Sequence, residues 1–179
     1  MNKKNIALVT GASTGIGEAL SRELVQRGYS VIGLARSLDK LTNMKNELGS
    51  TFIPIVCDVS SKLDIEKASQ QISKQNLCPS IFFLNAGMAG EKVIENPNAF
   101  KLEMHEKIMA VNYFGVLAFI ECWEKLCQEN GGANFIVTSS VNAIFAAPTG
   151  SAYCASKAAI SKAFESLSLT YFGTNLKFS

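Results

Sequence analysis

Histidine is almost absent from this sequence, because His105 is the one histidine among 179 residues. A metal centre built on several imidazoles is therefore excluded. A Ser-His-Asp triad could use only His105, and no glycine-flanked nucleophile elbow accompanies it. We interpret His105 as an ordinary residue of a helix surface.

Cysteines are few and scattered, an odd set of five at positions 57, 78, 122, 127 and 154. Such a set does not favour a disulfide framework. Cys122 and Cys127 also lack the spacing of a zinc-binding pair. Reduced thiols in a cytoplasmic protein are the natural interpretation.

Long apolar runs and runs of one charge are lacking too. No stretch reaches the length of a membrane-spanning helix, and the N-terminal apolar run is too short for a signal-peptide core. Lysine and arginine are scattered and the net charge is +2, so no basic surface for nucleic acid is indicated. With 47% apolar and 18% charged residues, we expect a soluble, globular, cytoplasmic protein without a membrane or nucleic-acid partner.

What the chain does have is a regular alternation of short apolar runs and longer segments of helical periodicity. The helical segments include residues 101–128 and 152–172, and "TNLKFS" at the end begins a further strand. This alternation predicts a single α/β domain over residues 1–179, with a doubly wound parallel sheet between two layers of helices. The continuous apolar runs predict buried strands at 5–10, 30–35, 51–56, 80–85 and 133–140.

A glycine motif, "TGASTGIG" at residues 10–17, follows the first strand and opens the first helix. Gly11 permits a tight turn, Gly15 the close approach of a pyrophosphate, and Gly17 close packing of helix on strand. Free N–H groups at the helix start stabilise phosphate. The motif predicts a Rossmann-type dinucleotide site, and the alternative is a glycine-rich turn without a ligand. The predicted cofactor-binding residues here are Gly11, Ser13, Thr14, Gly15, Ile16 and Gly17.

The residues after the second strand bear on the choice between NAD and NADP. In "LARSLDK", Ala35 and Arg36 stand where an acidic residue would bond the ribose 2′-hydroxyl of NAD. An arginine can instead pair with the 2′-phosphate of NADP. We therefore predict NADP(H) in preference to NAD(H), with Arg36 and Ser37 in contact with the cofactor. The alternative is that Arg36 is a solvated surface residue.

A tyrosine and a lysine stand four residues apart in "YCASK", as Tyr153 and Lys157, within an alanine-rich segment. On a helix they would lie on one face, one turn apart. This spacing is common by chance, so the pair alone does not decide between catalysis and an ordinary surface.

Three further motifs follow the glycine loop. "CDV" contains Asp58 and Val59, "NAG" covers residues 85–87, and "VNYFG" contains Asn112. Ser140 lies 13 residues before the tyrosine. In this order and spacing the motifs resemble the short-chain dehydrogenase/reductase family over essentially the whole chain. The resemblance implies further cofactor contacts at Asp58, Val59, Asn85, Ala86 and Gly87, and also at Tyr153 and Lys157.

The resemblance also implies a reaction, which is hydride transfer between a nicotinamide and a carbonyl or alcohol substrate. Tyr153 would be the acid/base. A free phenol has a pKa of about 10, and a neighbouring ammonium such as that of Lys157 favours the phenolate. Ser140 would hold the substrate oxygen, and Asn112 would hold a water that links the lysine to solvent. The alternatives are that Ser140 caps a strand end and that Asn112 satisfies backbone groups in a kinked helix.

Against that family pattern, the C-terminal portion is apparently lacking, including the substrate-binding loop. We therefore also consider a dinucleotide-binding protein without turnover, and a structural subunit that uses its long apolar helix for assembly. The family usually pairs its two long helices across a dimer, so we expect a homodimer or homotetramer. Sequence alone does not identify the substrate.

Overall fold

The computed structural model describes residues 5–89, 101–148 and 150–179. Its centre is one six-stranded sheet with the order β3-β2-β1-β4-β5-β6. Every neighbouring pair of strands is parallel. The strands are β1 (Ile6–Thr10), β2 (Ser30–Ala35), β3 (Phe52–Val56), β4 (Ile81–Leu84), β5 (Ala133–Val137) and β6 (Leu176–Phe178).

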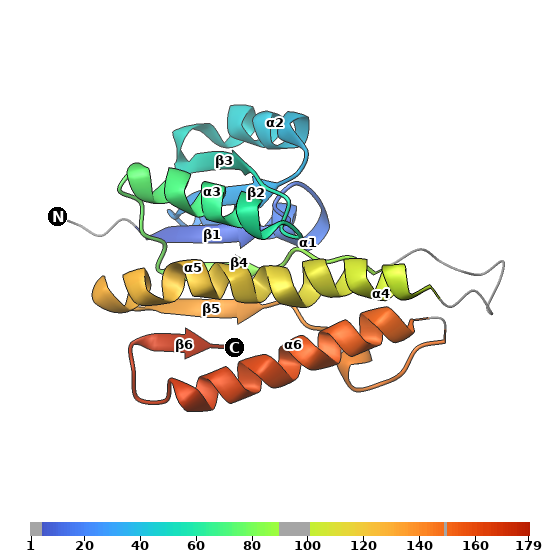
Figure 1. The fold of residues 1–179 in the computed structure, drawn as a ribbon. Helices are drawn as coiled ribbons and strands as arrows, with labels where there is room; N and C mark the ends of the chain where they lie inside the picture. Colours follow the sequence, from blue (N-terminus) through green and yellow to red (C-terminus); the bar gives the residue numbers. More distant parts are fainter. Residues whose placement is uncertain (1–4, 90–100, 149) are drawn as a thin grey trace.

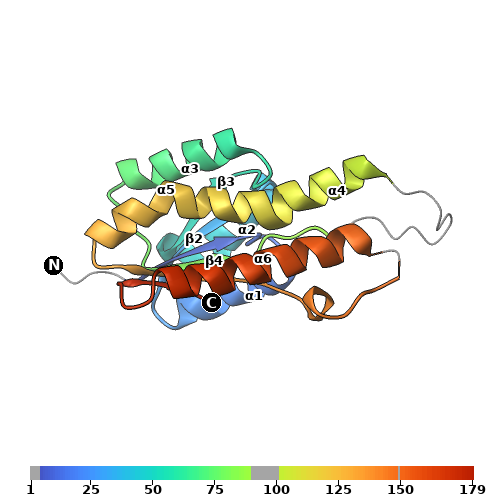
Figure 2. The same cartoon turned by 60° about the horizontal axis from the view of Figure 1, so that its bottom comes forward.

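Helices cover both faces of the sheet (Figures 1 and 2). One face carries α1 and α2, and the other carries α3, α5 and α6. The longer helices are α1 (Gly15–Gln26), α2 (Leu38–Leu48), α3 (Lys62–Lys74), α4 (Leu102–Met109), α5 (Gly115–Glu129) and α6 (Ser151–Thr170). The short ones are η1 (Gly49–Thr51), the π-helical turn η2 (Ala110–Phe114) and η3 (Val141–Ala143). The predicted three-layer α/β fold is confirmed.

Two apolar cores hold the layers together. The larger lies between the sheet and α3, α5 and α6, where the rings of Phe82 and Phe135 stack with their centroids 4.6 Å apart. Trp123 of α5 is fully buried there and donates a 3.0 Å hydrogen bond to Ser69 Oγ of α3. The smaller core lies under α1 and α2. The strands are apolar without alternation because both of their faces are covered.

Two predicted elements differ from the structure. The strand expected over 133–140 ends at Val137, which pairs with Leu84, the last residue of β4, and residues 138–140 belong to no strand. The single helix expected over 101–128 is interrupted by the π-helical turn η2. The further strand expected at the C-terminal end is present as β6, parallel to β5. Among the described residues, we find no helix with the length and apolar character needed to cross a membrane.

Candidate functional site

The glycine loop between β1 and α1 has a backbone that depends on glycine. Gly11 and Gly15 adopt φ angles of +68° and +56°, a region that disfavours residues with a Cβ. A Cβ on Gly17 would lie 2.3 Å from the Gly11 carbonyl oxygen, so no larger residue fits there. Helix α1 begins at Gly15, and the Thr14 side chain does not cap it. Its first-turn N–H groups therefore suit an anion such as a pyrophosphate.

Polar contacts attach this loop to the segment after β4. Thr10 Oγ1 accepts a 3.0 Å hydrogen bond from the Ala86 N–H, and Asn85 Nδ2 donates to the Thr10 carbonyl at 3.3 Å. A Cβ on Gly11 would lie 3.0 Å from the Ala86 Cα, so the two segments pack backbone against backbone. The glycine loop and residues 85–87 thus lie side by side at the carboxyl ends of β1 and β4.

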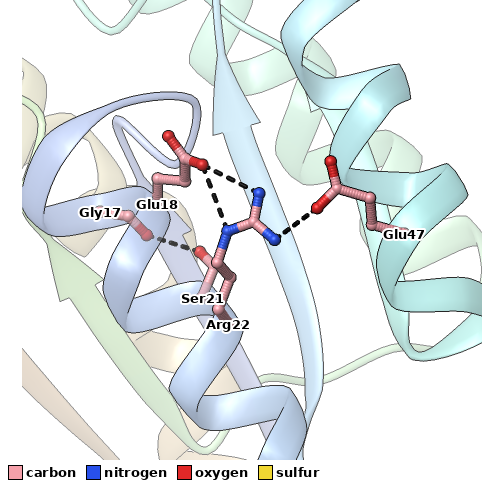
Figure 3. A network of polar contacts seen from close by, with 5 residues as sticks. All are labelled: Gly17, Glu18, Ser21, Arg22 and Glu47. Carbon is pink, nitrogen blue, oxygen red and sulfur yellow. Dashed lines mark hydrogen bonds and ion pairs between the residues drawn. The ribbon is translucent and has the colours of Figure 1, made fainter.

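The helix that carries the glycine loop is itself fixed to α2 (Figure 3). Arg22 of α1 donates to Glu18 Oε1 from Nε and Nη2 at 3.2 and 2.9 Å, and to Glu47 of α2 from Nη1 at 2.5 Å. Ser21 Oγ donates to the Gly17 carbonyl at 2.7 Å. Half-exposed ion pairs of this kind contribute at most about 1 kcal/mol each, so this network orients α1 more than it stabilises the protein.

Arg36 and Asp58 follow the neighbouring strands β2 and β3. The Arg36 side chain is exposed, and Ser37 occupies the N-cap of α2. Asp58 Oδ1 accepts hydrogen bonds from the Ser60 N–H and Oγ at 2.9 and 2.7 Å. Partial burial acts to raise the pKa of Asp58, but these hydrogen bonds and the Arg36 charge lower it overall. The result is an ionised carboxylate and an exposed guanidinium at one end of the sheet.

Asn112 lies within the π-helical turn and is 1% exposed. Its Oδ1 accepts the Met88 N–H at 2.8 Å, and its Nδ2 donates to the Met88 carbonyl and to Ser156 Oγ, each at 2.9 Å. Both hydrogens of the amide nitrogen are therefore used. The alternative considered from the sequence is that Asn112 satisfies backbone groups in a kinked helix, but the backbone groups that its side chain bonds are those of Met88, which lies outside that helix. If Asn112 holds a water, an atom other than its amide nitrogen must bond that water.

Lys157 of α6 is buried, with 4% of its surface exposed. Its Nζ donates a 2.7 Å hydrogen bond to the Thr138 carbonyl and lies 5.8 Å from the centroid of the Tyr153 ring. Burial lowers the pKa of Lys157. A Cβ on Gly87 would lie 3.6 Å both from this Nζ and from Asn112 Oδ1. Residues 85–87, η2 and α6 therefore converge on one spot.

Ser140 is not the end of β5 but the N-cap of η3, where its Oγ accepts the Asn142 N–H at 3.2 Å. This contact matches the capping alternative, although the cap belongs to a short helix and not to a strand. Helix η3 packs against α6, which carries Tyr153 and Lys157. Ser140 as a residue is half-buried.

Three residues in this region escaped the sequence-based prediction, namely Thr10, Thr138 and Ser156. Thr138 acts through its carbonyl, and its Oγ1 also donates to Asn85 Oδ1 at 3.0 Å. Every residue has a backbone carbonyl, so the residue type at position 138 does not indicate this role as a hydrogen-bond acceptor. Ser156 could have been found as a polar residue on the buried side of an alanine-rich helix.

Comparison with known proteins decides the family. A model of the short chain dehydrogenase family matches residues 5–179. The chain belongs to the short-chain dehydrogenase family. The resemblance seen in the sequence motifs is thereby confirmed.

Individual relatives of this chain extend beyond the matched region. An NADPH-dependent pterin aldehyde reductase of Arabidopsis thaliana is 32% identical in an alignment 157 residues long, which covers 86% of this chain and 63% of that protein. An uncharacterized oxidoreductase of Mycobacterium bovis is 27% identical in an alignment 183 residues long, gaps included, which covers 99% of this chain and 53% of that protein. The chain thus spans between about half and two thirds of the length of these relatives.

Solved structures show the same fold. A serine dehydrogenase in its closed form, complexed with NADP+, has a TM-score of 0.89 at 26% identity over 97% of this chain and 69% of that one. A short-chain dehydrogenase from Streptomyces avermitilis has a TM-score of 0.90 at 23% identity, over 98% and 64% of the two chains.

Proposed function

We propose that this chain forms the cofactor-binding and catalytic part of an NADP(H)-dependent oxidoreductase acting on a carbonyl or alcohol substrate. Residues 1–179 would form one dinucleotide-binding domain, of which residues 1–4, 90–100 and 149 lie outside the described part. The observation that carries the proposal is the convergence of Lys157, Asn112 and Gly87 beside the glycine loop. Family membership supplies the reaction class.

The residues present fit a dinucleotide. The glycine loop offers open N–H groups, and a Cβ on Gly15 would meet nothing within 4 Å, so that face of the loop has room for a ligand. The pyrophosphate would be held by Gly11, Ser13, Thr14, Gly15, Ile16 and Gly17, the adenine side by Arg36, Ser37, Asp58 and Val59, and the nicotinamide side by Asn85, Ala86, Gly87, Tyr153 and Lys157. When bound, the nicotinamide supplies or accepts the hydride.

The preference for NADP(H) rests on Arg36. Its guanidinium is exposed beyond the end of β2, and no carboxylate occupies position 35 or 36. A 2′-phosphate would gain a charge-assisted hydrogen bond there. Two similar proteins support the proposal, the reductase named NADPH-dependent and the dehydrogenase complexed with NADP+.

The protein's part in the chemistry is proton transfer at the substrate oxygen. In the reducing direction the Tyr153 hydroxyl donates its proton to the oxygen of the carbonyl as its carbon receives hydride, and the product is an alcohol. The Lys157 ammonium, held by the Thr138 carbonyl, stabilises the phenolate that remains, and burial strengthens this attraction. The hydroxyl of the half-buried Ser140 holds the substrate oxygen.

The test is NADPH oxidation by the purified chain on a panel of aldehydes and ketones, followed at the nicotinamide absorbance. Tyr153→Phe removes the proton and keeps the ring, so kcat is expected to fall by 10²-fold or more, roughly the contribution of a general acid. Tyr29→Phe, between α1 and β2, is the matched control. Turnover of Tyr153→Phe within a few-fold of the parent would refute the acid/base role.

A second proposal is a dinucleotide-binding protein without turnover. Two observations favour it, namely the Ser140 hydroxyl serving as a helix cap and the Asn112 amide nitrogen being fully used in structural contacts. A rise of the unfolding temperature with NADPH, without oxidation on any carbonyl of the panel, would favour this second proposal over the first. No rise with NADPH would favour a structural subunit.

The proposal also covers the oligomeric state of the protein and its compartment in the cell. Exposed apolar side chains lie at η2 and at the end of α6, and include Phe114, Leu169 and Phe172. We expect α5 and α6 to pair across a homodimer, itself able to form a homotetramer. None of the five cysteines, all of which lie in the described part of the chain, forms a disulfide, which supports a reducing compartment such as the cytoplasm.

A further inference from the structure

Ser156 carries a hydroxyl that is completely buried and completely bonded. It lies on α6 between Tyr153 and Lys157 and is 0% exposed. Its Oγ accepts a 2.9 Å hydrogen bond from Asn112 Nδ2 and donates a 2.8 Å hydrogen bond to the Tyr153 carbonyl. The second contact orients the hydroxyl proton away from Asn112, so the lone pairs face the amide.

This hydroxyl belongs to a longer set of contacts. Asn112 also holds both polar backbone groups of Met88, the residue that follows the segment 85–87. A continuous path therefore runs from the backbone after β4, through the π-helical turn, to the backbone of Tyr153. All of its side-chain members are buried, so water does not substitute readily for a lost partner.

Two consecutive residues of α6 attach it in different directions. Ser156 is bonded to η2, while Lys157 is bonded to the Thr138 carbonyl beyond β5. Consecutive helical residues project about 100° apart, so the two contacts together oppose both rotation and sliding of this turn. The turn is the one that presents the Tyr153 ring.

We propose that Ser156 is a positioning residue, which sets the place of Tyr153 relative to the cofactor-bordering segment 85–88. The proposal rests on the oxidoreductase function proposed above. Removal of the hydroxyl leaves a buried N–H of Asn112 without a partner, and either Asn112 or the helix turn then moves. A misplacement of about 1 Å at a reacting group can lower the rate roughly 10²-fold.

The experiment compares Ser156→Ala with Ser166→Ala, an exposed serine on the same helix. For Ser156→Ala we expect kcat to fall at least tenfold, while the Kd for NADPH stays within twofold of the parent. The pH profile of kcat is expected to shift as well, because the surroundings of Tyr153 change. Ser166→Ala is expected to match the parent in all three measurements. If Ser156→Ala does not fold, Ser156→Cys, which keeps the size of the side chain, takes its place.

A double-mutant cycle tests whether the effect passes through Asn112. If it does, Ser156→Ala combined with Asn112→Ala is no slower than Asn112→Ala alone. Independent, multiplying effects would contradict the proposal. So would a lowered unfolding temperature with unchanged kcat and pH profile, because the hydroxyl would then be only structural.

A measurement without turnover separates this proposal from the proposed function. Amide exchange at Met88, followed by NMR, reports whether its N–H remains held by Asn112. We expect Ser156→Ala to accelerate it at least tenfold and Ser166→Ala to leave it unchanged. If the parent shows no activity, the oxidoreductase function fails, and this exchange alone decides whether Ser156 positions the segment. Unchanged exchange overturns the inference.

Discussion

The Nζ of Lys157 lies 2.7 Å from the carbonyl oxygen of Thr138, so the end of β5 holds the lysine that faces the Tyr153 ring. Thr138 is itself held by Asn85, through its hydroxyl. The lysine is therefore set in place before any ligand is bound, and its remaining two N–H groups are directed by that contact.

Loss of this ammonium should change both rate and pH dependence. For Lys157→Met we expect kcat to fall roughly 10²-fold or more, because the phenolate of Tyr153 loses its neighbouring cation. The acidic limb of the pH profile of alcohol oxidation, along which the rate rises with pH, should move to higher pH for the same reason. Rates measured from pH 6 to 10 check this. Lys162→Met, on the exposed side of α6, is the control, and equal behaviour of the two variants would contradict the assignment.

The proposed preference for NADP(H) rests on one exposed side chain, that of Arg36. Arg36→Ala removes the guanidinium proposed to contact the 2′-phosphate, so the KM for NADPH should rise about tenfold or more. The KM for NADH should stay within about threefold, because NADH lacks that phosphate. Arg27→Ala removes another exposed arginine and should affect neither. Equal effects of Arg36→Ala on both cofactors would remove Arg36 from the site.

Gly17 should be the least replaceable residue of the glycine loop. An alanine there would place its Cβ 2.3 Å from the Gly11 carbonyl oxygen. The backbone must then move, at a cost of about 1–3 kcal/mol, and NADPH binding should be lost as the loop opens. Gly28→Ala also introduces strain, at φ +85°, but meets nothing within 4 Å and lies away from the loop. Thermal unfolding and NADPH titration of both variants test the difference.

Thiol reactivity should divide the five cysteines. Burial raises the pKa of Cys57 and of Cys127 to about 12. At pH 8 such a thiol has a thiolate fraction of about 10⁻⁴, and only the thiolate reacts with iodoacetamide. Mass spectrometry of the alkylated native protein should find these two modified last, after the half-buried Cys78 and Cys154. In denaturant all five should react together. Early alkylation of Cys127 in the native protein would show that its end of α5 opens.

The proposed assembly can be tested by light scattering during size exclusion. We expect a mass two or four times that of the chain, stable on dilution. Leu169→Glu, at the exposed end of α6, should lower it, because a charge would enter the apolar contact. Leu63→Glu changes another exposed leucine, on α3, and should leave the mass unchanged. A monomer that persists at high concentration would count against pairing.

Much of this arrangement could be predicted from the residues alone. Strand positions were predictable because both faces of the sheet are covered, which makes the strands continuously apolar. The need for glycine at position 11 was predictable because a strand–turn–helix connection of this length requires a positive φ. The order of the motifs indicated the family before any comparison.

Other features depend on contacts between distant segments. The π-helical turn around Asn112 is not marked by a proline or glycine inside it, and the local sequence reads as one continuous helix. The end of β5 at Val137 coincides with the end of its partner β4 at Leu84, and the residues of β5 themselves do not indicate this. The roles of Thr138 and Ser156 depend on which groups lie opposite them, and residue type does not report this.

The hydrogen bond between Thr10 and Ala86 joins residues 76 positions apart. Strand β1 lies in the middle of the sheet, yet its partner β4 is made much later in synthesis. The glycine loop therefore cannot reach its final shape before β4 and residue 86 have been synthesised. Such distant pairing slows folding, so we expect the nascent chain to acquire affinity for dinucleotide late, in one step, as β4 inserts beside β1.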